Sequence, residues 1–157
     1  MKMRLIVMGK TDEPWLRSGI HEYEMRIGHY IPFEIIEIPA LKNAATLTHA
    51  EQNLRESELI SKQIFPGDIL VLMDEHGAEM RSIEFATFLN KQFSAGGKTL
   101  VFAVGGPFGF DPGLKKRARF ILSLGKMTFS HQMVRLFIAE QLYRALTILR
   151  GESYHHE

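Results

Sequence analysis

The chain has 157 residues, no cysteine and a formal net charge of +1 at pH 7. The lack of cysteine excludes disulfides and thiolate chemistry, and the near-neutral charge restricts any RNA contact to a local patch or to a substrate held by a larger assembly. The first apolar run, residues 5–8, is too short for a signal peptide or a membrane span. We therefore expect a single cytoplasmic domain over residues 1–157.

Strands and helices are predicted to alternate through the first half of the chain. Residues 5–8, closed by Gly9, predict a buried strand, and residues 13–28 predict a helix that begins near Asp12 and Pro14. The apolar face of this helix is expected to contain Trp15, Leu16, Ile20, Tyr23 and Ile27. A second strand is predicted over residues 33–38. After a polar connection, a helix over residues 48–65 places Leu54, Glu58 and Ile64 at helical spacings.

The second half continues the alternation. Strands are predicted over residues 69–73, 99–104 and 120–122, and helices over residues 82–93, 112–118 and 131–150. Residues 74–77 are expected to turn the chain away after the third strand. Apolar strands separated by helices predict an α/β fold with a parallel sheet that is covered on both faces.

A glycine-rich segment, VFAVGGPFGFDPG, follows the fourth strand. Glycines allow backbone amides to approach a ligand closely, and the carboxyl ends of parallel strands are where open α/β sheets bind ligands. Pro107 and Phe110 break the dinucleotide-binding glycine pattern, and there is no Gly-Lys-Ser/Thr of a phosphate loop. An ordinary oxidoreductase is therefore disfavoured, while a purely structural turn remains an alternative.

The last predicted helix is apolar on almost every side, which is typical of a helix buried in a core or against another chain. In a small domain, a homodimer interface is the economical explanation. Among its few polar residues, Glu140 and Arg144 are four apart and could simply pair with each other.

Several blocks of the sequence, spread over essentially the whole chain, resemble the RlmH family of SPOUT-superfamily methyltransferases. The blocks are MRLIVMGK, EYEMRI, FEIIEIP, VLMDEHG, FAVGGPFG and the C-terminal LSLGKMTFSHQMVRLFIAEQLYRALTILRGESYHHE. The resemblance implies a parallel sheet flanked by helices, with a deep trefoil knot and the cofactor site within residues 70–157. It also implies a homodimer that uses S-adenosylmethionine to methylate ring nitrogen 3 of a pseudouridine in large-subunit ribosomal RNA, on the assembled ribosome, without a metal.

The resemblance assigns cofactor contacts to two single residues and one loop. Met73 would form a wall of the adenine site, and Gly106 is the second glycine of the loop, where a side chain is expected to fill cofactor space. The knot loop consists of Gly125, Lys126, Met127, Thr128, Phe129 and Ser130. Relatives commonly have serine and proline where this chain has Gly125 and Ser130, which puts a side-chain role at position 125 and the stiffness of the loop in doubt. Ser130 is suited to cap the following helix.

For catalysis and RNA contact, the resemblance and the chemistry favour His131, Arg144, Tyr154 and His155. Tyr154 could stack on an extruded base, and the histidines or Arg144 could assist removal of the imide proton. A metal site at His155 and His156 lacks a third ligand in the sequence. Which group takes the proton stays open, as do a non-catalytic binding module and a different RNA substrate.

Overall fold

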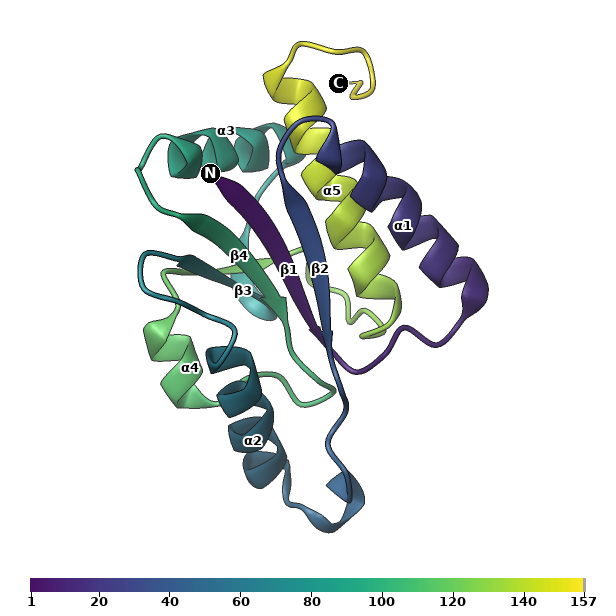
Figure 1. Cartoon of the computed structure of the whole chain (residues 1–157), viewed down its shortest axis with the longest axis vertical. Coiled ribbons are helices and arrows are strands. Elements are labelled where there is room, and N and C mark those ends of the chain that lie inside the picture. The colour runs from purple at the N-terminus through teal and green to yellow at the C-terminus, as the bar shows by residue number, and fades with distance from the viewer. Residues whose placement is uncertain (157) are drawn as a thin grey trace.

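The computed structural model describes residues 1–156 and contains a five-stranded parallel sheet in the order β2-β1-β4-β3-β5 (Figure 1). The strands are β1 (Lys2–Met8), β2 (Phe33–Ile38), β3 (Ile69–Glu79), β4 (Thr99–Val104) and β5 (Phe120–Ser123). The helices are α1 (Pro14–Gly28), α2 (His49–Ser61), α3 (Ser82–Phe93), α4 (Pro112–Arg117) and α5 (Met133–Leu149), with a 3-10 turn over Ala44–Thr46. Within the described part of the chain, no helix is long and apolar enough to cross a membrane.

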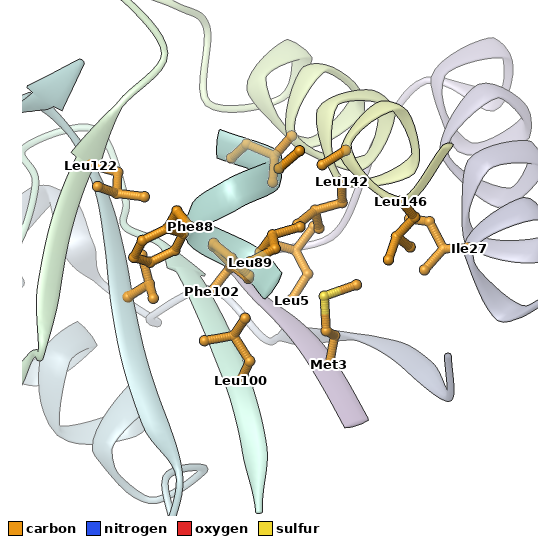
Figure 2. Close-up of a cluster of buried hydrophobic side chains, with 14 of the residues drawn as sticks. Met3, Leu5, Ile27, Phe88, Leu89, Leu100, Phe102, Leu122, Leu142 and Leu146 are labelled. Atoms are coloured by element: carbon orange, nitrogen blue, oxygen red, sulfur yellow. The ribbon is translucent and has the colours of Figure 1, made fainter. Parts of the chain in front are cut away.

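The helices cover both faces of the sheet: α1, α3 and α5 lie on one face and α2 and α4 on the other (Figure 1). Successive side chains of a strand point to opposite faces, so β1 supplies Leu5 to one core and Ile6 to the other. Figure 2 shows the larger core, in which Leu5, Phe102 and Leu142 pack between the sheet and the helices. The predicted parallel sheet with helices on both faces is confirmed.

The third strand is longer than predicted. Instead of turning away after Met73, the chain remains in β3 as far as Glu79, and its pairing with β5 shifts register between Met73 and Ala78. Gly77 lies so close to β5 that a Cβ there would be 2.6 Å from the Leu122 carbonyl carbon. The close approach of the two strands, rather than a tight turn, explains why residue 77 is a glycine.

Two predicted helix faces also need correction. Trp15 is 59% exposed, although Leu16, Ile20 and Ile27 of α1 are buried as predicted. On α2, Leu54 is exposed, whereas Glu56 and Ser57 are buried. The helix ends at Ser61 rather than at residue 65. Part of its buried face lies against polar backbone of the glycine loop, so the apolar periodicity was a poor guide.

Helix α5 is covered by α1, α3 and the sheet, more completely than its position at the end of the chain suggested. Ile138, Leu142 and Leu146 are buried in the chain's own core. The apolar character of α5 is thus explained mostly by packing within one chain, and of its large apolar side chains Phe137 and Leu149 stay exposed.

Candidate active site

The main candidate site, which we call the β3–β4 cavity, has a volume of about 490 Å³ and lies at the carboxyl end of β4, beside residues 73–76 of β3. Met73 and Val104 line it from the two strands, and Lys115 lines it from α4. The remaining walls are the glycine loop over residues 105–110, residues 74–76, and the segment from Ser123 into the start of α5. Its volume lies within the roughly 300–1,000 Å³ that small-molecule sites occupy.

Close backbone packing shapes the glycine loop. A Cβ at Gly105 would be 2.9 Å from the Gly109 carbonyl oxygen, and a Cβ at Gly106 would be 2.7 Å from the Glu56 Oε1 atom. A side chain at Gly106 was expected to fill the ligand space directly, but its Cβ would instead meet the Glu56 carboxylate. That side chain would strike Glu56 behind the loop, and the loop would have to move.

Helix α2 holds the glycine loop from behind. The Asn53 side-chain amide donates to the Phe108 carbonyl at 2.9 Å, and the Ser57 hydroxyl accepts from the Asp111 amide at 3.0 Å. The His49 ring stacks on Phe108 with 3.6 Å between ring centroids. Sequence reasoning could not predict these supports, because each joins a side chain of α2 to a loop that is distant along the chain.

The loop predicted over residues 125–130 forms a second wall of the cavity. Gly125, Met127, Thr128 and Phe129 line the cavity, whereas Lys126 and Ser130 are not among its lining residues. The Thr128 hydroxyl donates to Glu75 at 3.2 Å, which links this wall to the β3 extension. Four of the six loop residues therefore lie where the sequence assignment needs them.

Ser130 acts at the start of α5, as expected from its hydroxyl. Its Oγ atom accepts from the backbone amides of Gln132 and Met133, each at 3.2 Å. These amides belong to the helix start, where N–H groups lack partners within the helix. The predicted capping role is confirmed.

His131 is exposed and lines the β3–β4 cavity, whereas Arg144, Tyr154 and His155 form a separate tail cluster. The Arg144 guanidinium is 3.2 Å from the His155 Nδ1 atom and 4.7 Å from the Tyr154 ring centroid. It also pairs with Glu140, the alternative that the sequence suggested.

The Tyr154 hydroxyl connects the tail cluster to α1 and α5. This hydroxyl donates to Glu140 at 3.0 Å and lies 3.3 Å from the Tyr23 hydroxyl. Burial, followed by hydrogen bonds to Tyr23 and Glu140, raises the pKa of Tyr154. The tail follows Gly151, just beyond the end of α5 at Leu149. It is packed more firmly than this position suggested.

The four candidate catalytic residues lie at two separate places along α5. The tail cluster contacts the helix at Glu140 and Arg144, which are 9 and 13 residues beyond His131, or roughly 14–20 Å at about 1.5 Å per residue. In Figure 1 the C-terminus lies at the far end of α5 from the carboxyl ends of the strands. Within one chain, therefore, His131 and the tail cluster do not share a site, a separation that helix length alone could have indicated.

Arg135 was missed as an important residue by sequence reasoning. It is 2% exposed and donates to the Met8 and Gly9 carbonyls at 2.7 and 2.9 Å and to the Thr11 hydroxyl at 2.9 Å. Its guanidinium also lies 3.6 Å from Glu37. A single arginine in an otherwise apolar helical stripe was the available signal. Arg135 fixes the end of β1 next to the candidate site.

Residues 1–156 contain no group of three or more His, Asp or Glu side chains placed to hold a metal ion. The His155 ring, considered from the sequence as a metal ligand, contacts the Arg144 guanidinium.

Comparison with known proteins gives consistent results. Residues 1–155 match a family described as "Predicted SPOUT methyltransferase". The chain is 53% identical to the ribosomal RNA large subunit methyltransferase H of Parabacteroides distasonis and 50% identical to that of Bacteroides fragilis, over 157 residues and the full length of both proteins. A solved structure of a probable methylase family protein from Haemophilus influenzae has a TM-score of 0.54 at 10% identity. That match covers 95% of this chain and 66% of the other, and shows a likeness of fold alone.

Proposed function

This chain belongs to the SPOUT methyltransferase family, and from that premise we propose that it transfers a methyl group from S-adenosylmethionine to large-subunit ribosomal RNA. The observation that carries the proposal is the β3–β4 cavity, since Met73, Gly106 and the 125–129 loop meet there from three distant parts of the sequence. These are the positions that the resemblance assigns to the cofactor.

The residues of the β3–β4 cavity fit S-adenosylmethionine. Met73, Val104 and Val134 offer apolar surface for a flat ring, and Gly105 and Gly106 line the cavity with backbone that no side chain covers. Met73, Gly106, Gly125, Met127, Thr128 and Phe129 would hold the cofactor, with Lys126 and Ser130 contributing through the backbone of the same loop. The bound cofactor supplies a methyl group on a sulfonium, which is already a good leaving group.

The acceptor in this proposal is ring nitrogen 3 of a pseudouridine in 23S ribosomal RNA. The imide N–H is a weak acid, so the protein has to position the base and favour loss of its proton. The net charge of +1 agrees with a substrate presented by the assembled ribosome in the cytoplasm, because tight binding of free RNA is then unnecessary.

His131, Arg144, Tyr154 and His155 complete one active site only if two protomers combine. We assign His131 to the rim of one protomer's cavity and the tail cluster to its partner, with Tyr154 stacking on the base and Arg144 or His155 assisting proton loss. The separation of His131 from the tail along α5 supports this arrangement. Phe137, 42% exposed on α5, is the proposed centre of the homodimer interface.

A deep trefoil knot in one SPOUT domain over residues 1–157 is part of the same proposal. We propose that the C-terminal segment threads past residues 74–81, and two observations place β5 against the extension of β3 in that region. First, the β3 extension remains paired with β5 beyond the register shift. Second, Gly77 lies against the backbone of Ile121 and Leu122.

Mass spectrometry of ribosomal RNA from cells with and without the gene tests the proposed function. The expected result is loss of one 3-methylpseudouridine from the large-subunit RNA, restored when the purified protein and S-adenosylmethionine are added to the deficient ribosomes. An unchanged modification profile, together with no cofactor binding by calorimetry, would instead indicate a non-catalytic binding module. Methylation of another nucleotide would correct the substrate alone.

A further inference from the structure

A second cavity, the β1–β4 cavity, has a volume of about 240 Å³ and lies at the carboxyl ends of β1 and β4. Beyond β1 the chain crosses to β2 at one side of the sheet, whereas beyond β4 it crosses to β5 at the other side. Such a reversal is where open α/β sheets form ligand crevices. The lining residues come from the start of the β1–α1 loop, residues 40–44, α2, the glycine loop and the beginning of the α5 region.

The two cavities share a wall. Gly106, Pro107 and His131 line both of them. The β1–β4 cavity is below the roughly 300 Å³ at which drug-sized sites begin, so its size suits one planar ring rather than a second nucleotide cofactor. A ring bound there would lie next to the site that we assign to the methyl donor.

Glu56 is the buried ionisable group of this cavity. It is 6% exposed, lines the cavity from α2, and its Oε1 atom has no hydrogen-bond partner among residues 1–156. Desolvation raises the pKa of this carboxyl, against a hydrogen bond with Gln52 that lowers it. A buried acceptor without a donor costs stability, so this atom is suited to receive a donor from a ligand.

Support of the glycine loop does not account for Glu56. Asn53 and Ser57, on the same side of α2, already bond to the Phe108 carbonyl and the Asp111 amide. The Glu56 Oε1 atom has no hydrogen-bond partner among residues 1–156, and the carboxylate abuts Gly106, where the lack of a side chain leaves room for it. The contacts of the glycine loop therefore leave the buried Glu56 Oε1 atom without a donor.

We propose that the β1–β4 cavity receives the flipped-out target base, and that Glu56 accepts a hydrogen bond from ring N1–H of pseudouridine. This inference rests on the proposed function. In pseudouridine the ribose is attached through carbon, so ring nitrogen 1 keeps its hydrogen, whereas in uridine that nitrogen carries the ribose. Glu56 would thus read the one N–H group that distinguishes the two nucleosides, and ring nitrogen 3 remains free to face the shared wall.

The physical basis of the selectivity is the cost of leaving Glu56 without a donor. A site that hydrogen-bonds an N–H group rejects an analogue that lacks it, because the buried acceptor then stays unpaired and desolvated. Lys10, exposed and part of the lining, places a positive charge at this cavity, where the backbone phosphate of an extruded nucleotide would follow the base.

Titration with free nucleosides tests the proposal on the wild-type full chain. Pseudouridine, N1-methylpseudouridine and uridine are added to protein with saturating S-adenosylhomocysteine, and backbone amide shifts are followed by NMR. We expect pseudouridine to shift the amides of Lys10, Gln52 and Gly106 and to bind about tenfold or more tightly than either analogue. Equal binding of the three nucleosides, or shifts confined to residues 123–129, would overturn the proposal.

A matched pair of variants on α2 separates recognition from folding. Glu56→Met removes the buried acceptor, and Glu58→Met makes the same change at an exposed position of the same helix. Glu56→Met should abolish the preference for pseudouridine in nucleoside binding and in turnover of ribosomes that carry pseudouridine or uridine at the target. Glu58→Met should keep the preference.

Calorimetry with S-adenosylmethionine distinguishes the two levels of the argument. Unchanged cofactor affinity in Glu56→Met supports the assignment of Glu56 to the base, whereas weaker affinity would show that the carboxylate serves the cofactor and would overturn it. If the wild-type protein binds no S-adenosylmethionine, the proposed function fails, and the nucleoside titration still decides whether the β1–β4 cavity reads N1–H.

Discussion

The polar groups near the two ends of α5 differ in whether they have hydrogen-bond or ion-pair partners within the chain. At the amino end, glycines and backbone amides border two cavities, and Glu56 keeps an oxygen without a partner among residues 1–156. At the carboxyl end, Tyr154 and Arg144 both contact Glu140. The amino end thus has groups that a ligand could pair with, whereas the tail cluster is held together by its own contacts; under the proposed function, a second protomer brings the tail cluster to the ligand.

Removing the tail should have the largest effect on catalysis. Deletion of residues 153–157 takes away Tyr154 and His155 but keeps Glu152, which accepts from the Tyr30 hydroxyl at 2.6 Å. We expect methyl transfer to fall by about 10²–10⁴-fold, the range for a catalytic group, while S-adenosylmethionine affinity stays nearly unchanged. Turnover and calorimetry on the same protein check this. Parallel loss of both would mean that the tail only covers the cofactor, and full activity would remove it from the mechanism.

A test of the dimer has to avoid core residues such as Leu142, which is fully buried in the chain's own core and would disrupt folding if replaced. Phe137→Glu places a charge at an exposed position of α5. The expected result is a folded monomer in sedimentation experiments with activity reduced by about 10²-fold or more, since His131 and the tail cluster would no longer meet.

Phe65→Glu is the matched control for this experiment. Phe65 is 53% exposed and contacts Arg4, near the end of α2, on the other side of the sheet from α5. This variant should remain dimeric and active. A wild-type protein that is an active monomer at working concentration would contradict the two-protomer site.

Gly106→Val should act on the cofactor end alone. The new Cβ would meet the Glu56 carboxylate, so the glycine loop must shift, and overpacking of this kind costs about 1–3 kcal/mol. We expect S-adenosylmethionine to bind about ten- to a hundredfold more weakly, with the fold and the dimer retained. Gly28→Val, at a position where a Cβ meets nothing within 4 Å, serves as the control in calorimetry. Normal cofactor affinity in Gly106→Val would place the site elsewhere.

The smallest expected effect concerns the capping of α5. Ser130→Ala removes the hydroxyl that accepts from the Gln132 and Met133 amides, and loss of such a cap costs about 0.5–2 kcal/mol. Urea unfolding should show a lower midpoint with an unchanged slope. An unaltered midpoint would mean that water replaces the hydroxyl at no cost.

The sequence was a good guide where turn residues and apolar runs agree. The strand over residues 99–104 and the helix over residues 82–93 match the structure at every boundary, because glycine pairs or a serine mark their ends. The extension of β3 past Met73 was missed, since its residues are polar and largely exposed and its pairing with β5 has no local signal.

The resemblance identified the candidate residues, but it did not show that they divide between the β3–β4 cavity and the tail cluster. The resemblance led to Met73, Gly106 and the 125–130 loop, most of which line one cavity. Glu56 escaped notice because a charged residue on a polar helix is usually solvated, and only the folded chain brings the glycine loop over it. Long-range contacts of this kind leave no periodic trace in a sequence.

The position of Arg135 has a consequence for how the protein is made. Its guanidinium satisfies carbonyl groups of Met8 and Gly9, at the end of the first strand, from the last helix of the chain. Contacts between such distant segments slow folding, because the closure of a long loop precedes the gain in stability. During synthesis, the end of β1 stays incomplete until α5 has left the ribosome, because Arg135 follows Gly9 by 126 residues.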